Sequence, residues 1–187
     1  MRLKLCWPKL ALLLGVLLPL GRLRAADAPL PTVSYVDLPR YSGHWVEIAR
    51  LPNAFESADE SATAEYALLS DQRLSIKNTD QRPDGTRHSI QGVAEVVPDS
   101  RNARWRVGFA GEPGFLPVSK KGNYWIIALD EAHYRFAMVG APDRRYLWVL
   151  ARTPFLDRSE LARLVARAHT LGFPTERMIR NPRKPKG

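Results

Sequence analysis

Strand-like runs separated by turns dominate the chain between residues 45 and 152, and eight such runs can be counted. Turn residues recur at a spacing of roughly 8–14 residues, and no helical pattern separates the runs. The clearest turn is Pro83-Asp84-Gly85, where proline presets φ and glycine accepts a positive φ. We therefore expect an all-β fold, an eight-stranded antiparallel up-and-down barrel. The expected strands cover 45–50, 62–69, 74–80, 88–97, 104–109, 124–129, 135–139 and 146–152.

The two ends of this strand series predict how the barrel closes. In an up-and-down barrel the first and eighth strands pair, so the start of one lies beside the end of the other. This places the guanidinium of Arg152 over the indole of Trp45, a contact worth about 0.5–2 kcal/mol. Gly43 precedes Trp45 by two residues and suggests a backbone bend beside the large ring. We therefore expect Gly43, Trp45 and Arg152 to plug one end of the barrel rather than to contact a ligand.

Three sequence blocks in a fixed order carry a family resemblance. They are Gly43-His44-Trp45-Val46-Glu47-Ile48-Ala49-Arg50-Leu51-Pro52, Tyr124-Trp125-Ile126-Ile127-Ala128-Leu129-Asp130 and residues 146–154, which include Arg152. The pattern resembles the lipocalin family, whose G-x-W motif corresponds to Gly43-His44-Trp45, and the closest resemblance is to the bacterial lipocalins and apolipoprotein D. It covers about residues 35–182. It implies a barrel that binds a fatty acid or a lysophospholipid, for lipid transport or storage that maintains the cell envelope under stress.

Alternation along each strand separates the side chains expected inside the barrel from those outside. Trp105, Val107 and Phe109 share the face opposite Arg104 and Arg106, so the apolar set must be interior. The same alternation in the other strands predicts an apolar interior with a few polar groups, which is how small-molecule sites are built. The family resemblance places Trp148 in the wall of this interior. The candidate ligand-binding residues are Tyr66, Asn78, Trp105, Val107, Phe109, Tyr124, Ile126, Tyr146, Trp148 and Leu150. Ala64, Leu68, Ile76, Ile90, Gly92, Ala94, Val96, Ala137 and Val139 complete the expected inner set.

A helix is expected after the last strand, over about residues 157–171. Asp157 is a suitable N-cap and Glu160 follows at capping-box spacing, while Gly172 and Pro174 end the helix. Its single apolar stripe predicts that it docks on the outer wall of the barrel. The stripe consists of Leu161, Leu164, Val165, Ala168 and Leu171. Residues 177–179 are expected to add a short strand, and residues 51–61 to form a lid over the open end.

The N-terminus has the features of a secretory signal peptide over residues 1–25. Basic residues precede an apolar run from residue 10 to residue 20, and small residues follow at positions 25, 26 and 28. Cleavage is expected after Ala25 or after Ala28. Cys6 precedes the apolar run, whereas a bacterial lipoprotein carries its cysteine at the cleavage site, so we expect an exported, soluble periplasmic protein. Because many bacterial lipocalins are lipoproteins, outer-membrane association is the alternative.

The rest of the chain divides into three parts. Residues 26–40 are a polar, proline-containing lead-in that is expected to cross the closed end of the barrel. Residues 41–180 hold the barrel and the helix, and residues 181–187 form a basic tail. Five basic residues fall within the signal, which leaves 23 basic and 19 acidic residues and reduces the net charge from +9 to +4. That balance is ordinary for a soluble protein and predicts no nucleic-acid partner.

Motifs of catalysis and metal binding are missing from the sequence. It has no G-x-S-x-G, no H-E-x-x-H and no phosphate loop, and its four histidines are scattered. The single cysteine lies within the signal, so no disulfide or thiolate metal site is expected in the mature chain. We therefore expect no enzyme activity, no metal and no cofactor.

Two other functions are consistent with the same pattern. Any barrel core needs apolar inner faces, so the chain is also compatible with an interaction or structural module whose barrel is filled. An enzyme acting on a lipophilic substrate is the third class. The loop 111–123 places apolar residues beside Lys120 and Lys121, which suggests peripheral contact with an anionic membrane. The sequence leaves the oligomeric state open.

Overall fold

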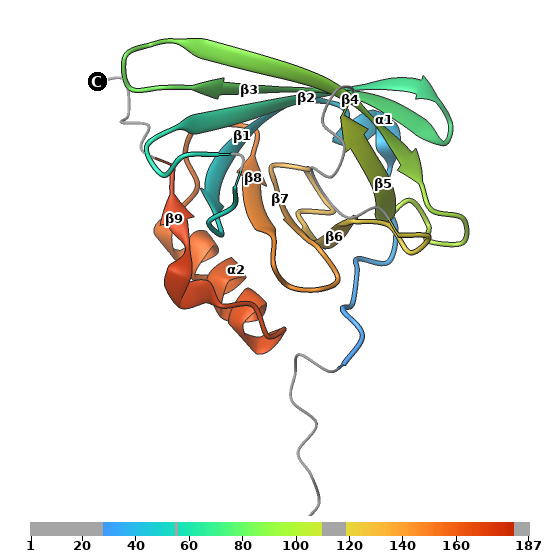
Figure 1. The fold of residues 1–187 in the computed structure, drawn as a ribbon. Helices are drawn as coiled ribbons and strands as arrows, with labels where there is room; N and C mark the ends of the chain where they lie inside the picture. The colour runs from blue at the N-terminus through green and yellow to red at the C-terminus, as the bar shows by residue number, and fades with distance from the viewer. Residues whose placement is uncertain (1–27, 55, 110–118, 182–187) are drawn as a thin grey trace, which may run out of the picture.

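A computed structural model describes residues 28–54, 56–109 and 119–181 (Figure 1). The expected signal peptide, most of the loop 111–123 and nearly all of the basic tail lie outside the described residues. The strands are β1 (Gly43–Arg50), β2 (Ser61–Ser70), β3 (Arg73–Gln81), β4 (Arg87–Val96), β5 (Arg104–Phe109), β6 (Tyr124–Leu129), β7 (Phe136–Gly140), β8 (Leu147–Ala151) and β9 (Ile179–Arg180). The helices are α1 (Leu38–Tyr41), α2 (Arg158–Thr170) and the short 3₁₀-helix η1 (Thr175–Arg177).

The sheet closes as the strand series predicts. Its order is β2-β3-β4-β5-β6-β7-β8-β1-β9, and β2 also pairs with β1, so β1 to β8 form a closed antiparallel barrel. In β1, Val46 lies opposite Ala151 of β8 on one side and opposite Thr63 of β2 on the other. The additional strand β9 pairs with the end of β1. The sequence places this strand slightly early, because η1 occupies residues 175–177.

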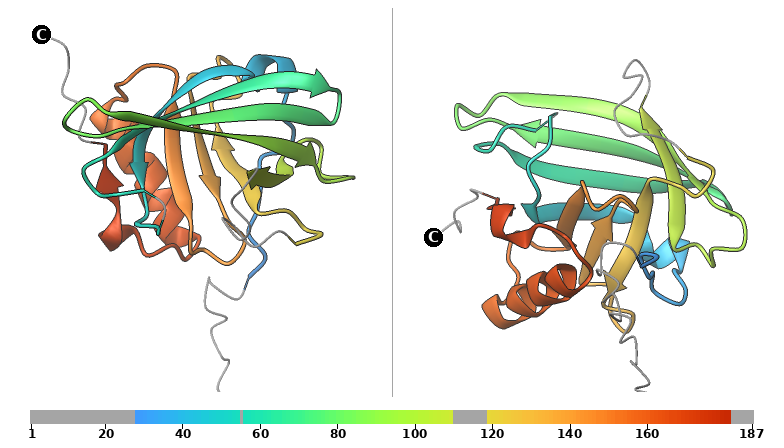
Figure 2. Two further views of the ribbon diagram at one scale, coloured as in Figure 1. Left: turned by 45° about the horizontal axis from the view of Figure 1, so that its top comes forward. Right: turned by 60° about the horizontal axis from the view of Figure 1, so that its bottom comes forward.

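Two apolar cores lie on the two faces of the barrel wall. The inner core lies inside the barrel, whereas the outer core lies between the wall and α2, which Figure 2 shows outside the barrel. Along β8, Leu147 and Val149 point outward to α2, and Leu150 points inward. Burying each such leucine or valine contributes about 1.5–3 kcal/mol. Because its side chains alternate, β8 contributes to both cores and so stabilises both the barrel and the docking of α2.

The helix α2 follows its expected bounds but not its expected cap. Asp157 is the N-cap residue, yet its side chain makes no capping hydrogen bond. The carboxylate of Glu160 accepts hydrogen bonds from Arg163 in the next turn instead. The predicted capping box is therefore wrong. Gly172 has a φ of 86°, as expected of a residue that ends a helix.

Leu68, which belongs to the expected inner set, lies outside the barrel. Leu68 is 42% exposed although it shares the parity of Tyr66, which is buried. The strand β1 begins at Gly43 opposite Tyr66, so the rest of β2 pairs only with β3 and projects beyond the barrel. The alternation rule fails here because one of the two neighbouring strands has ended.

The segment before β1 covers the end of the barrel where β1 begins. The amide nitrogen of Val36 donates to the carbonyl oxygen of Arg101, 3.1 Å away, and the side chain of Val36 is fully buried. The one-turn helix α1 follows, with Asp37 as N-cap accepting from the amide of Arg40. The sequence pattern does not predict α1, because four residues are too few to show a helical period. Its residue Tyr41 enters the inner core.

Candidate functional site: the barrel cavity

A cavity opens in the barrel above the inner core. It holds about 580 Å³ of space free of atoms, including the part open to solvent. The barrel interior is therefore not completely filled. Its lining consists of Glu47, Glu56, Ala62, Thr63, Ala64, Tyr66, Ile76, Asn78, Val107, Phe109, Tyr124, Trp148 and Leu150.

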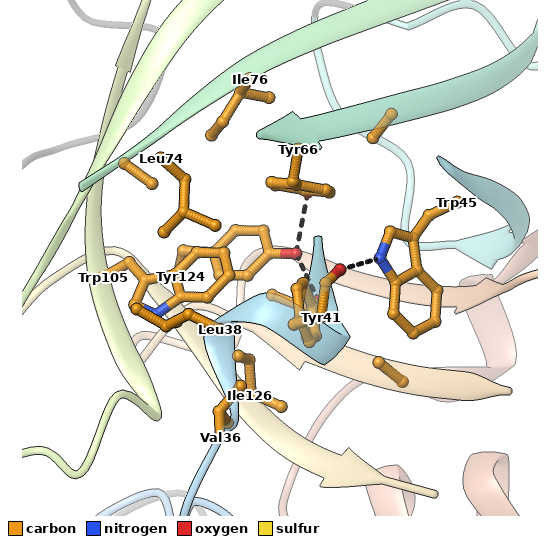
Figure 3. Packing of buried hydrophobic residues seen from close by; sticks show 14 of the residues in the cluster. Val36, Leu38, Tyr41, Trp45, Tyr66, Leu74, Ile76, Trp105, Tyr124 and Ile126 are labelled. Carbon is orange, nitrogen blue, oxygen red and sulfur yellow. Dashed lines mark hydrogen bonds between the residues drawn. The ribbon is translucent and has the colours of Figure 1, made fainter. Parts of the chain in front are cut away.

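The floor of the cavity is a chain of three tyrosine hydroxyls (Figure 3). The hydroxyl of Tyr124 lies 2.9 Å from that of Tyr41 and 2.9 Å from that of Tyr66. Burial raises the pKa of Tyr66 to about 12. It also raises the pKa values of Tyr41 and Tyr124 well above the usual value for a tyrosine hydroxyl. The indole of Trp105 stacks on Tyr124 with ring centroids 5.0 Å apart. The floor is thus neutral and held together by hydrogen bonds and aromatic contacts.

The end opposite the opening is sealed by the contact that strand closure predicts. The guanidinium carbon of Arg152 lies 3.9 Å from the ring centroid of Trp45. Its nitrogens donate to the carbonyl oxygens of His44, at 2.9 Å, and Arg40, at 2.6 Å. Gly43 has a φ of 94°, in the region that favours glycine. The expected contact between Trp45 and Arg152 is confirmed.

The mouth of the cavity contains a buried ion-pair cluster that the sequence analysis missed. The guanidinium of Arg50 is 1% exposed and lies between the carboxylates of Glu47, at 3.2 Å, and Glu56, at 2.9 Å. Arg50 also donates to the carbonyl oxygen of Ser57. Glu56 and Ser57 belong to the loop between β1 and β2, which is the segment expected to form a lid. The cluster therefore fastens this loop to the barrel.

A β-bulge brings the two charged residues of β1 to the same face. Glu47 and Arg50 are three residues apart, so a regular strand would point them in opposite directions. The register between β1 and β8 shifts between Glu47 and Ala49, which leaves Ile48 without an opposite residue. Ile48 and Ala49 both face the outer core, and Arg50 returns to the inside. Parity with Trp45 is the sequence signal that could have placed Glu47 inside, whereas the direction of Arg50 depends on the bulge.

Carboxylates outnumber cations at this mouth. Burial, reinforced by the neighbouring Glu56, raises the pKa of Glu47 well above its usual value. Burial also raises the pKa of Asp80 on β3 to about 6, with Glu56 and Glu60 contributing in the same direction. The described residues contain no group of three or more His, Cys, Asp or Glu side chains placed to hold a metal ion.

The structure places seven of the ten candidate ligand-binding residues in the lining: Tyr66, Asn78, Val107, Phe109, Tyr124, Trp148 and Leu150. Trp105 and Ile126 are interior, as parity predicts, but both are fully buried in the core and line no part of the cavity. Tyr146 precedes β8, where it stacks on Trp148 with ring centroids 6.0 Å apart, and it borders two surface hollows instead. These three residues therefore lie outside the cavity lining, because strand parity gives the face of a residue but not its depth.

Polar contacts connect the β1–β2 loop to the cavity wall. Asn53 donates to Glu56 at 2.6 Å through its side-chain amide and accepts from the backbone amide of Glu56 at 2.9 Å. The indole nitrogen of Trp148 makes a long hydrogen bond of 3.5 Å to the same carboxylate. Glu56 therefore lies at the junction of the loop, the cavity wall and Arg50.

A closed eight-stranded barrel with an apolar cavity at one end and a helix on its outer wall is the architecture of small-ligand-binding β-barrels. The chain belongs to the lipocalin family, whose model for a lipocalin-like domain matches residues 36–183. This family binds small hydrophobic ligands, and its members are generally carriers rather than enzymes.

Similar proteins come from distant organisms. The chain is 34% identical to the outer membrane lipoprotein Blc of Vibrio cholerae over 148 residues, which is 79% of this chain and 82% of the relative. It is 27% identical to mouse apolipoprotein D over 155 residues, covering 79% and 77% of the two chains. The solved structure of insecticyanin from the tobacco hornworm Manduca sexta superposes with a TM-score of 0.60 at 21% identity, covering 84% and 86%. The last likeness shows the fold alone.

No helix among the described residues is long and apolar enough to cross a membrane. The membrane contact expected of the loop 111–123 falls largely outside the described residues, although Lys120 and Lys121 at its end are exposed.

Proposed function

We propose that the protein binds one single-chain amphiphile, a fatty acid or a lysophospholipid, in the barrel cavity. The observation that carries this proposal is the cavity itself, whose wall is apolar around Val107, Phe109 and Leu150 and whose mouth is polar. A polar mouth above an apolar wall matches a molecule with a head group and a hydrocarbon tail.

The expected affinity follows from the balance of burial and association. Each buried methylene contributes about 0.8 kcal/mol, while association costs about 4–15 kcal/mol. A long chain that is only partly covered therefore gives micromolar rather than picomolar binding. Native mass spectrometry of protein purified from cells tests for a co-purified acyl lipid, and calorimetric titration with dodecanoate and with a lysophosphatidylcholine measures the affinity.

A cavity-blocking variant connects binding to this site. Ala62 lines the cavity, so Ala62→Phe is expected to weaken acyl-chain binding at least tenfold. Ala67 is exposed on the same strand, and Ala67→Phe is the matched control that should leave binding unchanged. Unaltered binding in Ala62→Phe, or no binding of any acyl ligand to the unchanged protein, would refute the proposal.

The biological role proposed for this binding is lipid transport or storage that maintains the cell envelope under stress, without catalysis. The support is membership of a family of carriers and the similarity to relatives named as outer membrane lipoproteins. We propose an exported, soluble periplasmic protein, with attachment to the outer membrane as the alternative. Osmotic-shock fractionation combined with palmitate labelling distinguishes the two, since a labelled membrane-bound band would exclude the soluble form.

A further inference from the structure

We infer that the cavity mouth selects amphiphiles with a cationic head group, such as an ammonium, over those that end in a free carboxylate. The inference rests on the proposed function, because it names the head group of a ligand in the same cavity. Its starting point is the arrangement of charges around Arg50. The carboxylate-bearing residues Glu47 and Glu56 line the cavity, whereas Arg50 does not. An entering ligand therefore meets the carboxylates, with the guanidinium behind them.

Three partners already surround that guanidinium. Its Nη1 donates to Glu47 and its Nη2 to the carbonyl oxygen of Ser57, while its Nε lies 2.9 Å from the carboxylate of Glu56 without a hydrogen bond to it. Arg50 is 1% exposed and cannot turn toward the cavity without breaking these contacts. A fatty-acid carboxylate would thus find no available cation in the mouth and would approach two carboxylates instead.

The charged groups around the cavity mouth do not cancel its excess of acidic side chains. Arg50 supplies one positive charge for two carboxylates, and Asp80 on β3 adds a further acid whose pKa is raised by burial and by Glu56. Glu60 is paired with Arg82 at 3.1 Å. His88 on β4 also acts on Asp80. Burial is the main cause of the raised pKa of Glu47 and repulsion from Glu56 adds to it, so a cation placed in the mouth would relieve that repulsion.

Uncharged groups of the lining favour the same head group. The side-chain oxygen of Asn78 is buried without a hydrogen-bond partner and belongs to a residue that lines the cavity. It can accept a hydrogen bond from an ammonium but not from a carboxylate. The indole of Trp148 also lines the cavity, and an indole face attracts cations. Two carboxylates, an amide oxygen and an indole together describe a site for a cation attached to a hydrocarbon chain.

The test compares three molecules with the same ten-carbon chain: decylammonium, decanoate and decanol. Calorimetric titration of the unchanged protein near pH 7.5 is expected to give at least tenfold tighter binding of decylammonium than of decanoate, with decanol between them. A tenfold ratio corresponds to about 1.4 kcal/mol. This comparison needs no substitution, so it does not depend on a variant that folds.

The variant Glu56→Gln assigns the preference to the mouth. It should weaken decylammonium binding about tenfold and strengthen decanoate binding, while binding of decanol stays within about twofold. Glu131 is exposed in the loop between β6 and β7, so Glu131→Gln is the matched control and should change none of the three affinities. Circular dichroism confirms that each variant is folded. Decylammonium affinity should also increase from pH 5 to pH 8, as the carboxyls of the cluster ionise.

The outcomes separate this inference from the function on which it rests. Decanoate binding as tightly as decylammonium, or decanol binding equally well, would overturn the head-group preference and leave the acyl-chain site intact. Failure of all three molecules to bind would overturn both. Equal effects of Glu56→Gln and Glu131→Gln would show that the preference does not arise at the mouth, and would likewise refute the inference.

Discussion

Replacing Arg152 with alanine removes the group that seals the closed end of the barrel. Its guanidinium carbon lies 3.9 Å from the ring centroid of Trp45. It also donates to the carbonyl oxygens of His44, Arg40 and Tyr134, at 2.9, 2.6 and 3.2 Å. One side chain thus connects the start of β1, the helix α1 and the loop before β7.

The expected loss of stability can be worked from these contacts. The cation–π contact is partly exposed and contributes about 1 kcal/mol. Each of the three donating nitrogens, one of which also reaches the carbonyl oxygen of Tyr41, contributes about 0.5–1 kcal/mol, since the freed carbonyl oxygens can bind water. The free energy of unfolding should therefore fall by about 2.5–4 kcal/mol. With a urea dependence of about 2 kcal/mol per molar, the unfolding midpoint falls by about 1–2 M.

Urea unfolding followed by circular dichroism measures this shift. Arg152→Lys keeps the charge but loses the planar fork, so an intermediate loss is expected. Arg87 is exposed at the start of β4, and Arg87→Ala is the control, with a change within about 0.5 kcal/mol. Ligand affinity of Arg152→Ala should stay within about twofold, because the residue lies at the opposite end from the cavity mouth. An unchanged midpoint, or a large loss of affinity without a loss of stability, would contradict the reasoning.

Three further predictions concern single substitutions in the cavity wall, at the start of β1 and on β3. Trp148 lines the cavity, so Trp148→Phe should remove most of the ligand-induced change in tryptophan emission, whereas Trp125→Phe should leave it intact, since Trp125 belongs to the outer core; the reverse result would invert the assignment of inside and outside. Gly43 has a φ of 94°, so Gly43→Ala should lower the unfolding free energy by about 1–2 kcal/mol in thermal melts, and an unchanged melting temperature would speak against the need for glycine. Asp80 has a raised pKa of about 6, so ionisation of its carboxyl lowers the free energy of unfolding as the pH rises from 4 through 6. Asp80→Asn should therefore exceed the unchanged protein in stability by about 1 kcal/mol at pH 8, after allowance for its partial exposure, but not at pH 4; a gain that is equal at both pH values would exclude titration as its cause.

The order and bounds of the strands and the end of α2 could be predicted from local sequence patterns. Alternation gave each strand from β1 to β8 to within a few residues, and glycine and proline marked the end of α2. Closure of an up-and-down series then implied the pairing of Trp45 with Arg152, although 107 residues separate them in the sequence. These features were predictable because periodicity and turn chemistry are properties of neighbouring residues.

The cavity depended on information that neighbouring residues do not contain. Parity assigned Trp105 and Ile126 to the inside, but only packing against the segment around Tyr41 decided that they lie beneath the floor and not in the wall. In the same way, only the end of β1 opposite Tyr66 decided that Leu68 is exposed. Depth in a barrel is set by which strands continue on either side.

The sequence by itself determined the eight strands, their inner and outer faces, the docked helix and the seal at the closed end. The tertiary structure alone decided the chemistry of the mouth. The register shift at Ile48 turns Arg50 inward beside Glu47, and the β1–β2 loop returns Glu56 to the same guanidinium. The physical reason is that a bulge is defined by two strands together, whereas alternation is defined by one.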